Sequence, residues 1–232
     1  LRHLPCKEMT VFRSLSVSPV AKLVAITAIA AISAFSAPIA SAQAPLEPDV
    51  NVEALMKTGE LPDIVMGQED APYTIIEYAS MTCPHCANFH LQVLPEIKQK
   101  YIDTGVAKLI LREFPFDNVA AAAFMLARCV DDAKYYDFVG LLFQNQEEWA
   151  FGSDPLPGLQ KFAKQAGFTE ARFNECLRDE KLLKHVEWVR NRGHSEFEVR
   201  ATPTFFINGK RLDNSSISAF DEVLGSATPD KS

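Results

Sequence analysis

Two cysteines, Cys83 and Cys86, stand in the segment MTCPHCANFH (residues 81–90), separated by Pro84 and His85. A pair at this spacing can be half of a zinc site, a structural disulfide or a thiol couple that does redox chemistry. A structural zinc site needs four ligands, and only two histidines lie near this pair in the sequence. A disulfide within the motif would close a ring too small to restrict the unfolded chain usefully. Redox chemistry is therefore the favoured interpretation.

The elements predicted around the motif place Cys83 at the start of a helix. Residues 73–80 (YTIIEYAS) have the β-branched and aromatic side chains of a strand, and a helical apolar pattern follows the motif. Unpaired N–H groups at a helix start favour the thiolate, so the pKa of Cys83 should lie below its free value of roughly 8.5. Pro84 suits a first helical turn, and His85 can add a donor or a positive charge. Cys83 is then the outer thiol and Cys86 the more buried, resolving thiol.

The rest of the chain predicts a β-α-β unit, a helical block and a β-β-α unit. A second strand is expected at 106–114 (VAKLILREF), and apolar side chains follow helical spacing from about 116 to 198, where Asp117 is a plausible helix cap. The segment TPTFFING then predicts a strand and a two-residue turn at Asn208-Gly209, before a partner strand and a closing helix. The fold class is therefore α/β.

The segment RATPTFFING (residues 200–209) completes a family resemblance. A strand, the CPHC motif, a helix, a helical block and then Thr202-Pro203 opening a strand resemble the DsbA-like thiol:disulfide oxidoreductases of the thioredoxin superfamily. The resemblance covers about residues 62–225. It implies a thioredoxin fold with a helical domain inserted between the β-α-β and β-β-α halves.

The resemblance implies a catalytic role for the CPHC motif. Cys83 and Cys86 match the redox pair, in which Cys83 forms the mixed disulfide with a substrate protein and Cys86 resolves it. Pro84 and His85 match the dipeptide that tunes this pair. No metal and no dissociable cofactor are expected.

The resemblance also implies supporting roles for three residues outside the motif. Pro203 matches a cis-proline that packs against the disulfide, and Thr202 matches the variable residue before it. Cis bonds are only about 5–6% of X-Pro bonds in folded proteins, so the sequence alone would never predict one here. Glu77 matches an acid buried beneath the active site, with an exposed strand position as its alternative.

The first 42 residues predict a signal peptide. Four basic residues and one acidic residue give this stretch a net charge of +3, and an apolar run of 13 residues follows (23–35, LVAITAIAAISAF). That run is short for a membrane span, which needs about 20 residues, and Ala40-Ser41-Ala42 offers a cleavage site. An uncleaved anchor is the alternative. The expected organisation is a signal peptide at 1–42, an N-terminal arm at 43–72 and a DsbA-like domain at 73–232 with its insertion at about 116–198.

Export affects the interpretation of the two remaining cysteines in the mature chain, Cys129 and Cys176. Both fall in predicted amphipathic helices of the inserted block. In an oxidising compartment a structural disulfide between them is the leading interpretation, with buried free thiols or a second redox pair as alternatives.

These observations predict a periplasmic enzyme that donates disulfides to reduced or misoxidised exported proteins. By family analogy, a membrane redox partner would reoxidise it. An isomerase or reductase of the same fold remains an alternative, as does a thiol-based metal-binding or chaperone protein. The chain after the signal carries a net charge of −10, which makes nucleic acid an improbable partner, and the short arm favours a monomer.

Overall fold

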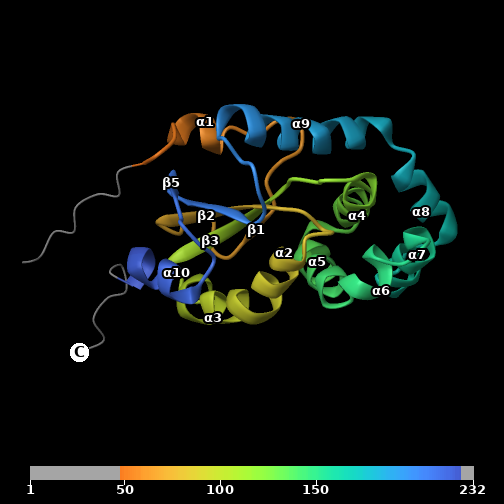
Figure 1. The fold of residues 1–232 in the computed structure, drawn as a ribbon, viewed down its shortest axis with the longest axis horizontal. Helices are drawn as coiled ribbons and strands as arrows, with labels where there is room; N and C mark the ends of the chain where they lie inside the picture. Colours follow the sequence, from red (N-terminus) through yellow and green to blue (C-terminus); the bar gives the residue numbers. More distant parts are fainter. Residues whose placement is uncertain (1–47, 226–232) are drawn as a thin grey trace, which may run out of the picture. The chain divides into compact units, whose positions relative to one another are not determined.

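A five-stranded sheet lies at the centre of residues 48–225, the part of the chain that this computed structural model describes (Figure 1). The signal peptide expected at 1–42 lies outside the described residues. The strands stand in the order β1-β3-β2-β4-β5. They are β1 (Val65–Met66), β2 (Tyr73–Ala79), β3 (Ala107–Glu113), β4 (Thr204–Ile207) and β5 (Lys210–Arg211).

The strand directions confirm the predicted α/β order. Strands β2 and β3 run parallel, as a β-α-β unit requires, whereas β4 pairs antiparallel with β2 and β5 pairs antiparallel with β4. The turn between β4 and β5 lies at Asn208 and Gly209, whose φ angles are 48° and 87°. Two positive φ angles at an Asn-Gly pair are those of a tight hairpin turn, which the sequence had predicted.

The helix after the CPHC motif packs on one face of the sheet together with α10 (Ile217–Leu224). It is not the uniform helix that the apolar spacing predicted. Its segments, in chain order, are α2 (Pro84–Asn88), a π turn (Phe89–Val93), α3 (Leu94–Ile97) and a second π turn (Lys98–Ile102). Pro95 lacks an N–H and its ring would clash with the carbonyl of Leu91 in an α-helix, which accounts for the widened first π turn.

The opposite face of the sheet is covered by α1 (Val52–Met56) and α9 (Glu180–Glu196), which Figure 1 shows along its upper side. Leu55 of α1 and Val189 of α9 share a buried apolar cluster with Ile76 of β2. Helix α9, which lies at the end of the insertion expected at about 116–198, therefore also belongs to the layers around the sheet. The arm at 43–72 likewise contributes β1, a strand of two residues that is too short to show any periodicity in the sequence.

The inserted helices form a third apolar cluster, which also includes Cys83 and Cys86. In chain order they are α4 (Asn118–Arg128), a 3-10 turn (Asp132–Lys134), α5 (Tyr135–Gln144), α6 (Gln146–Ala150), α7 (Pro155–Gln165) and α8 (Glu170–Leu177). The Asp117 carboxylate accepts from the backbone N–H of Ala120, so this predicted cap is confirmed. None of the helices in residues 48–225 combines the length and apolar character that crossing a membrane requires.

Candidate active site

The CPHC motif begins helix α2, with Cys83 as its N-cap and Pro84 at the first helical position. The N–H of Cys83 donates to the Ser80 carbonyl at 3.1 Å, which closes the turn between β2 and α2. Both thiols of the motif are free in this structure. Cys83 is 7% exposed and Cys86 is fully buried, so Cys83 is the thiol that a second protein can reach.

The surroundings of Cys83 lower the pKa of its thiol to about 5. The largest cause is a hydrogen bond from the Cys86 thiol, which outweighs the opposing effect of burial. The Thr202 side chain and the backbone N–H groups of Cys86 and His85 lower the pKa further. The donor expected from His85 is thus its backbone N–H, while the His85 side chain lies exposed at the surface.

The Cys86 thiol has the opposite character. Burial raises its pKa well above the ordinary value, and the hydrogen bond to Cys83 and the negative charge of Glu77 raise it further. Near neutral pH the pair therefore holds one thiolate, on Cys83, and one protonated thiol, on Cys86. This arrangement distinguishes an attacking from a resolving cysteine.

The loop before β4 faces the active-site sulfur. The Thr202-Pro203 peptide bond is cis, and the Cys83 sulfur lies 3.3 Å from the Thr202 carbonyl oxygen, to which it donates when the thiol is protonated. Within residues 48–225, no hydrogen-bond partner meets the buried Thr202 hydroxyl. The structure therefore brings the Thr202-Pro203 segment, 119 residues later in the sequence, into contact with the motif.

Glu77 is fully buried on β2, which excludes the exposed position that the sequence left open. Its Oε2 lies 2.9 Å from Nε2 of His90, which is also buried and packs against the Phe143 ring of α5. In the sequence, His90 was notable only as a histidine near the cysteine pair. Its position four residues after Cys86, on the same face of a helix, was the available signal.

Gln146 of α6 is a further site residue that the sequence did not indicate. Its buried side-chain amide donates to the Met81 carbonyl at 2.8 Å and to the Cys83 carbonyl at 3.0 Å. Nothing in a helical stretch of the sequence marks this glutamine. The contacts show that the inserted helices hold the motif's backbone in place.

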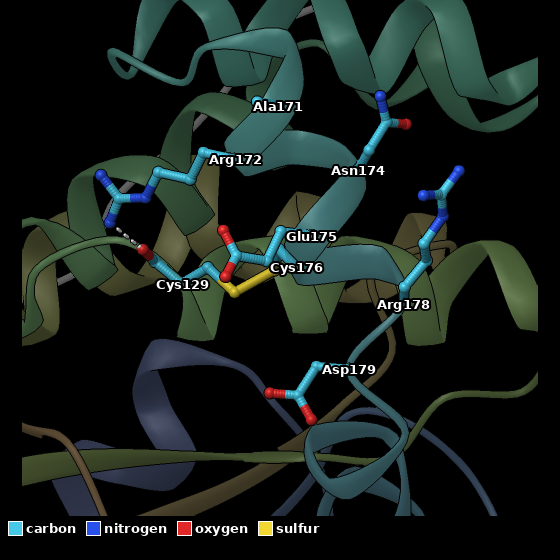
Figure 2. Close-up of a pocket in the computed structure, with 8 residues that line it drawn as sticks. All are labelled: Cys129, Ala171, Arg172, Asn174, Glu175, Cys176, Arg178 and Asp179. Atoms are coloured by element: carbon cyan, nitrogen blue, oxygen red, sulfur yellow. Dashed lines mark hydrogen bonds between the residues drawn. A yellow bond between two sulfur atoms is a disulfide. The ribbon is translucent and has the colours of Figure 1, made fainter.

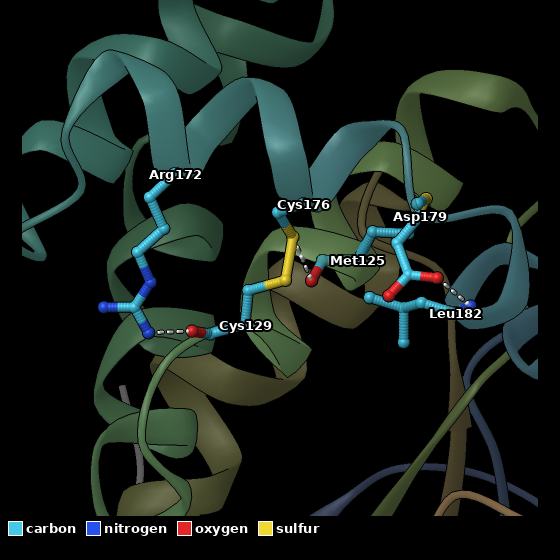
Figure 3. Close-up of a disulfide and its surroundings, with 6 residues drawn as sticks. All are labelled: Met125, Cys129, Arg172, Cys176, Asp179 and Leu182. Atoms are coloured by element: carbon cyan, nitrogen blue, oxygen red, sulfur yellow. Dashed lines mark hydrogen bonds between the residues drawn. A yellow bond between two sulfur atoms is a disulfide. The ribbon is translucent and has the colours of Figure 1, made fainter.

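Cys129 and Cys176 form a disulfide between the end of α4 and α8, far from the CPHC motif along the chain (Figure 3). The Arg172 guanidinium donates to the Cys129 carbonyl. Figure 2 shows the disulfide beside an open surface pocket, which α8 side chains line. Neither thiol of the CPHC motif lines this pocket. Nowhere in residues 48–225 does a group of three or more His, Cys, Asp or Glu side chains stand where it could hold a metal ion.

Comparisons with known proteins agree with this geometry. A family model described as thioredoxin matches residues 60–225. A Rickettsia bellii protein with the provisional name protein-disulfide oxidoreductase is 30% identical over 191 residues, which are 82% of this chain and 74% of that protein. Disulfide bond formation protein D of Bacillus subtilis is 28% identical over 169 residues, 68% of this chain and 72% of that protein.

The solved structures show the same relationship. The crystal structure of Wolbachia pipientis alpha-DsbA1 matches with a TM-score of 0.69 and 30% identity, over 75% of this chain and 94% of that one. The chain spans between 60% and 74% of the length of five Rickettsia relatives. This chain belongs to the thioredoxin family and, within it, to the DsbA-like protein-disulfide oxidoreductases.

Proposed function

We propose that this protein donates the disulfide of its Cys83–Cys86 pair to other proteins while they fold. The observation that carries the proposal is the contrast within the pair: the pKa of Cys83 is lowered to about 5, while that of the adjacent Cys86 is raised. A thiol of low pKa is a good leaving group in disulfide exchange. The reduced pair is thus stabilised relative to the oxidised pair, as a disulfide donor requires.

The chemistry proceeds in two exchanges. A substrate thiolate attacks the Cys83 sulfur of the oxidised pair, the Cys83–Cys86 bond breaks, and Cys86 leaves as a thiolate that takes up a proton. A second substrate thiolate then attacks the substrate sulfur of this mixed disulfide. Cys83 leaves as a thiolate with the bonding electrons, so the substrate is oxidised to a disulfide and the pair is reduced.

Several residues support these steps in the proposal. The backbone N–H groups of His85 and Cys86 and the Thr202 side chain stabilise the Cys83 thiolate, with Pro84 at the first helical position. Pro203 follows Thr202 in the loop whose Thr202 carbonyl meets the sulfur, and an extended substrate segment would pair with the backbone of this loop. Glu77 lies where its charge acts on Cys86.

The proposed place of action is the periplasm, reached through the signal peptide expected at 1–42. Reduced or misoxidised exported proteins would be the substrates, and a membrane redox partner would reoxidise the pair. The name of the Bacillus subtilis relative, which refers to disulfide bond formation, supports the direction of transfer. The protein would act as a monomer.

Disulfide transfer to a reduced, unfolded protein tests the proposal directly. The oxidised enzyme should form disulfides in that protein stoichiometrically, and the reduction potential of the Cys83–Cys86 pair should lie well above that of a thioredoxin, roughly −270 mV. The double variant Cys83→Ser/Cys86→Ser is the matched control and should transfer none. A potential at or below the thioredoxin value, with faster reduction of substrate disulfides than formation, would identify a reductase instead.

A further inference from the structure

Two fully buried carboxylates lie on the same face of the sheet beneath the active site. Glu77 of β2 pairs in register with Leu111 of β3, and Glu113 of β3 pairs with Ala79 of β2. The two acids are therefore diagonal neighbours on parallel strands, because side chains two positions apart in a strand point to the same face. Only Glu77 has a place in the chemistry described above.

In each carboxylate, only one of the two oxygens has a hydrogen-bond partner within residues 48–225. Oε2 of Glu77 lies 2.9 Å from the His90 ring nitrogen, and Oε1 of Glu113 accepts from the Arg128 guanidinium at 2.5 Å. Oε1 of Glu77 and Oε2 of Glu113 have no hydrogen-bond partner within residues 48–225. Leaving a buried polar atom unpaired costs about 1–3 kcal/mol, so two such atoms on one face require an explanation.

A third unpaired atom belongs to the same region. The Tyr135 hydroxyl is wholly buried and has no partner among the described side chains and backbone. The Arg128 guanidinium that binds Glu113 also lies over the Tyr135 ring, 5.3 Å from its centroid. Tyr135 packs in the same apolar cluster as Leu111 and Ala79, the strand partners of Glu77 and Glu113, so it lies on the face of the sheet that carries both acids. Burial raises the pKa of Tyr135, and the charges of Glu113 and Glu77 raise it further.

We propose that the three unpaired oxygens hold one internal water molecule. The two hydrogens of the water would bind Oε1 of Glu77 and Oε2 of Glu113, and its lone pair would accept from the Tyr135 hydroxyl. Buried waters typically make about three hydrogen bonds to polar groups that would otherwise be unsatisfied, which is the number available here. The water joins the Glu113–Arg128 ion pair to the acid beneath Cys86.

This network makes Glu113 and Tyr135 positioning residues for thiol exchange, an inference that rests on the proposed function. Cys86 is fully buried, and Cys83 is the thiol of the pair that a substrate would cover when it binds. The proton that Cys86 takes up when it leaves, or loses when it attacks, must therefore pass through the interior. Glu77 would exchange this proton with Cys86, and Tyr135 and Glu113 would hold Glu77 and the water in the orientation that the transfer needs.

The reaction of the reduced enzyme with an aromatic disulfide reagent isolates the Cys86 step. The Cys83 thiolate attacks first and releases one coloured thiolate. Cys86 then loses its proton, bonds to the Cys83 sulfur and releases the second. Tyr135→Phe removes only the unpaired hydroxyl and should slow the second release by about tenfold, less than the effect of a direct general base, while the first stays unchanged. Its second release should also acquire a solvent isotope effect, which a loss of packing alone would not produce.

Tyr136→Phe is the matched control. The Tyr136 hydroxyl is fully used by backbone groups, because it accepts from the Leu111 N–H and donates to the carbonyl of Ile64 or Leu109. Its loss should lower stability and leave the second release unchanged. Equal slowing by both variants, or no slowing by Tyr135→Phe, would refute the assignment.

A high-resolution crystal structure of the unaltered protein provides a test that does not depend on any variant folding. It should show an ordered water within about 3 Å of the two carboxylate oxygens and the Tyr135 hydroxyl. Direct contact among these atoms, with no water between them, would overturn the proposal. The aromatic disulfide reagent is itself the oxidant in the kinetic test, and the crystal structure needs no substrate. Both tests therefore stay interpretable even if the protein fails to donate disulfides to a protein substrate.

Discussion

One cysteine of each pair caps a helix, but the two cysteines cap opposite ends: Cys83 lies at a helix start and Cys129 at a helix end. Cys83 is the N-cap of α2, where backbone N–H groups point toward its sulfur, and it remains a free thiol beside Cys86. Cys129 is the C-cap of α4 and is bonded to Cys176, which lies 47 residues further along the chain. The helix dipole favours a negative charge at the first position and disfavours one at the second.

This difference shows that reactivity depends on what surrounds the sulfur rather than on the presence of a cysteine pair. The Cys83 thiolate has a neighbouring thiol, a side chain and two N–H groups to stabilise it. Near Cys129, the Arg172 guanidinium donates to the backbone carbonyl, and the Cys129 sulfur is bonded to Cys176. A thiolate formed there would lack comparable donors, so the second disulfide is suited to a structural role.

Removing one cysteine of the reactive pair should have the largest effect. Cys83→Ala should abolish exchange and trap no partner, because the exposed thiol is gone. Cys86→Ala should accumulate mixed disulfides with substrate proteins, because nothing resolves them. Non-reducing gels of each variant after incubation with a substrate protein that contains a disulfide, whose bond the Cys83 thiolate can attack, would show this. Equal trapping by both variants would reverse the assigned roles.

The lowered pKa of Cys83 should make the free energy of unfolding of the reduced protein depend on pH. The oxidised protein, which has no Cys83 thiol, should lack this dependence. The folded value is about 5, against 9.0 for an ordinary thiol, so the unfolded state binds more protons between these values. The gain in unfolding free energy is complete above about pH 9 and is lost as pH falls toward about 5, at about 1.4 kcal/mol per unit.

Denaturant unfolding of both forms between pH 4 and pH 9, together with thiolate absorbance, would measure this gain. The Cys83→Ser variant provides the control, since it should lose the pH-dependent part. If Cys83 titrated near its ordinary value and both forms showed the same pH dependence, the proposed donor role would fail.

Removing the second pair should affect stability and leave chemistry intact. The double variant Cys129→Ala/Cys176→Ala opens a loop of 47 residues, which should lower the free energy of unfolding by roughly 2–4 kcal/mol. Its rate of exchange at Cys83 should equal that of the unaltered protein. A large change in exchange rate would show that the two pairs are coupled and would contradict a purely structural role for the Cys129–Cys176 disulfide.

Features fixed by neighbouring residues were predictable from the sequence. The helix start at Cys83-Pro84, the cap at Asp117 and the turn at Asn208-Gly209 each depend on a few adjacent residues, and the structure has all of them. The order of strands and helices followed from apolar periodicity over longer windows. The prediction that Cys83 and Cys86 form the reactive pair also depended on local sequence, namely their spacing in the CPHC motif.

Features that depend on distant parts of the chain were not predictable in the same way. The Glu77–His90 pair and the two hydrogen bonds of Gln146 join different elements, and no local pattern encodes them. Strand β1 has only two residues, so its place in the sheet depends on pairing with β3. The cis bond before Pro203 was expected from the family resemblance alone, because base rates favour trans.

The smallest effect is expected from Thr202→Val, because valine has nearly the shape of threonine and lacks only its hydroxyl. This hydroxyl is buried and has no hydrogen-bond partner within residues 48–225, and the Thr202 side chain lowers the pKa of Cys83 less than the Cys86 thiol does. Thr202→Val should therefore raise the Cys83 pKa by a fraction of a unit and slightly slow disulfide donation. Titration of thiolate absorbance would measure the shift, with Thr204→Val as the control because the Thr204 hydroxyl is satisfied by the Ala201 carbonyl. An unchanged Cys83 pKa in Thr202→Val would mean that the hydroxyl does not reach the thiolate, and that the reactive pair depends on its own helix and on Cys86.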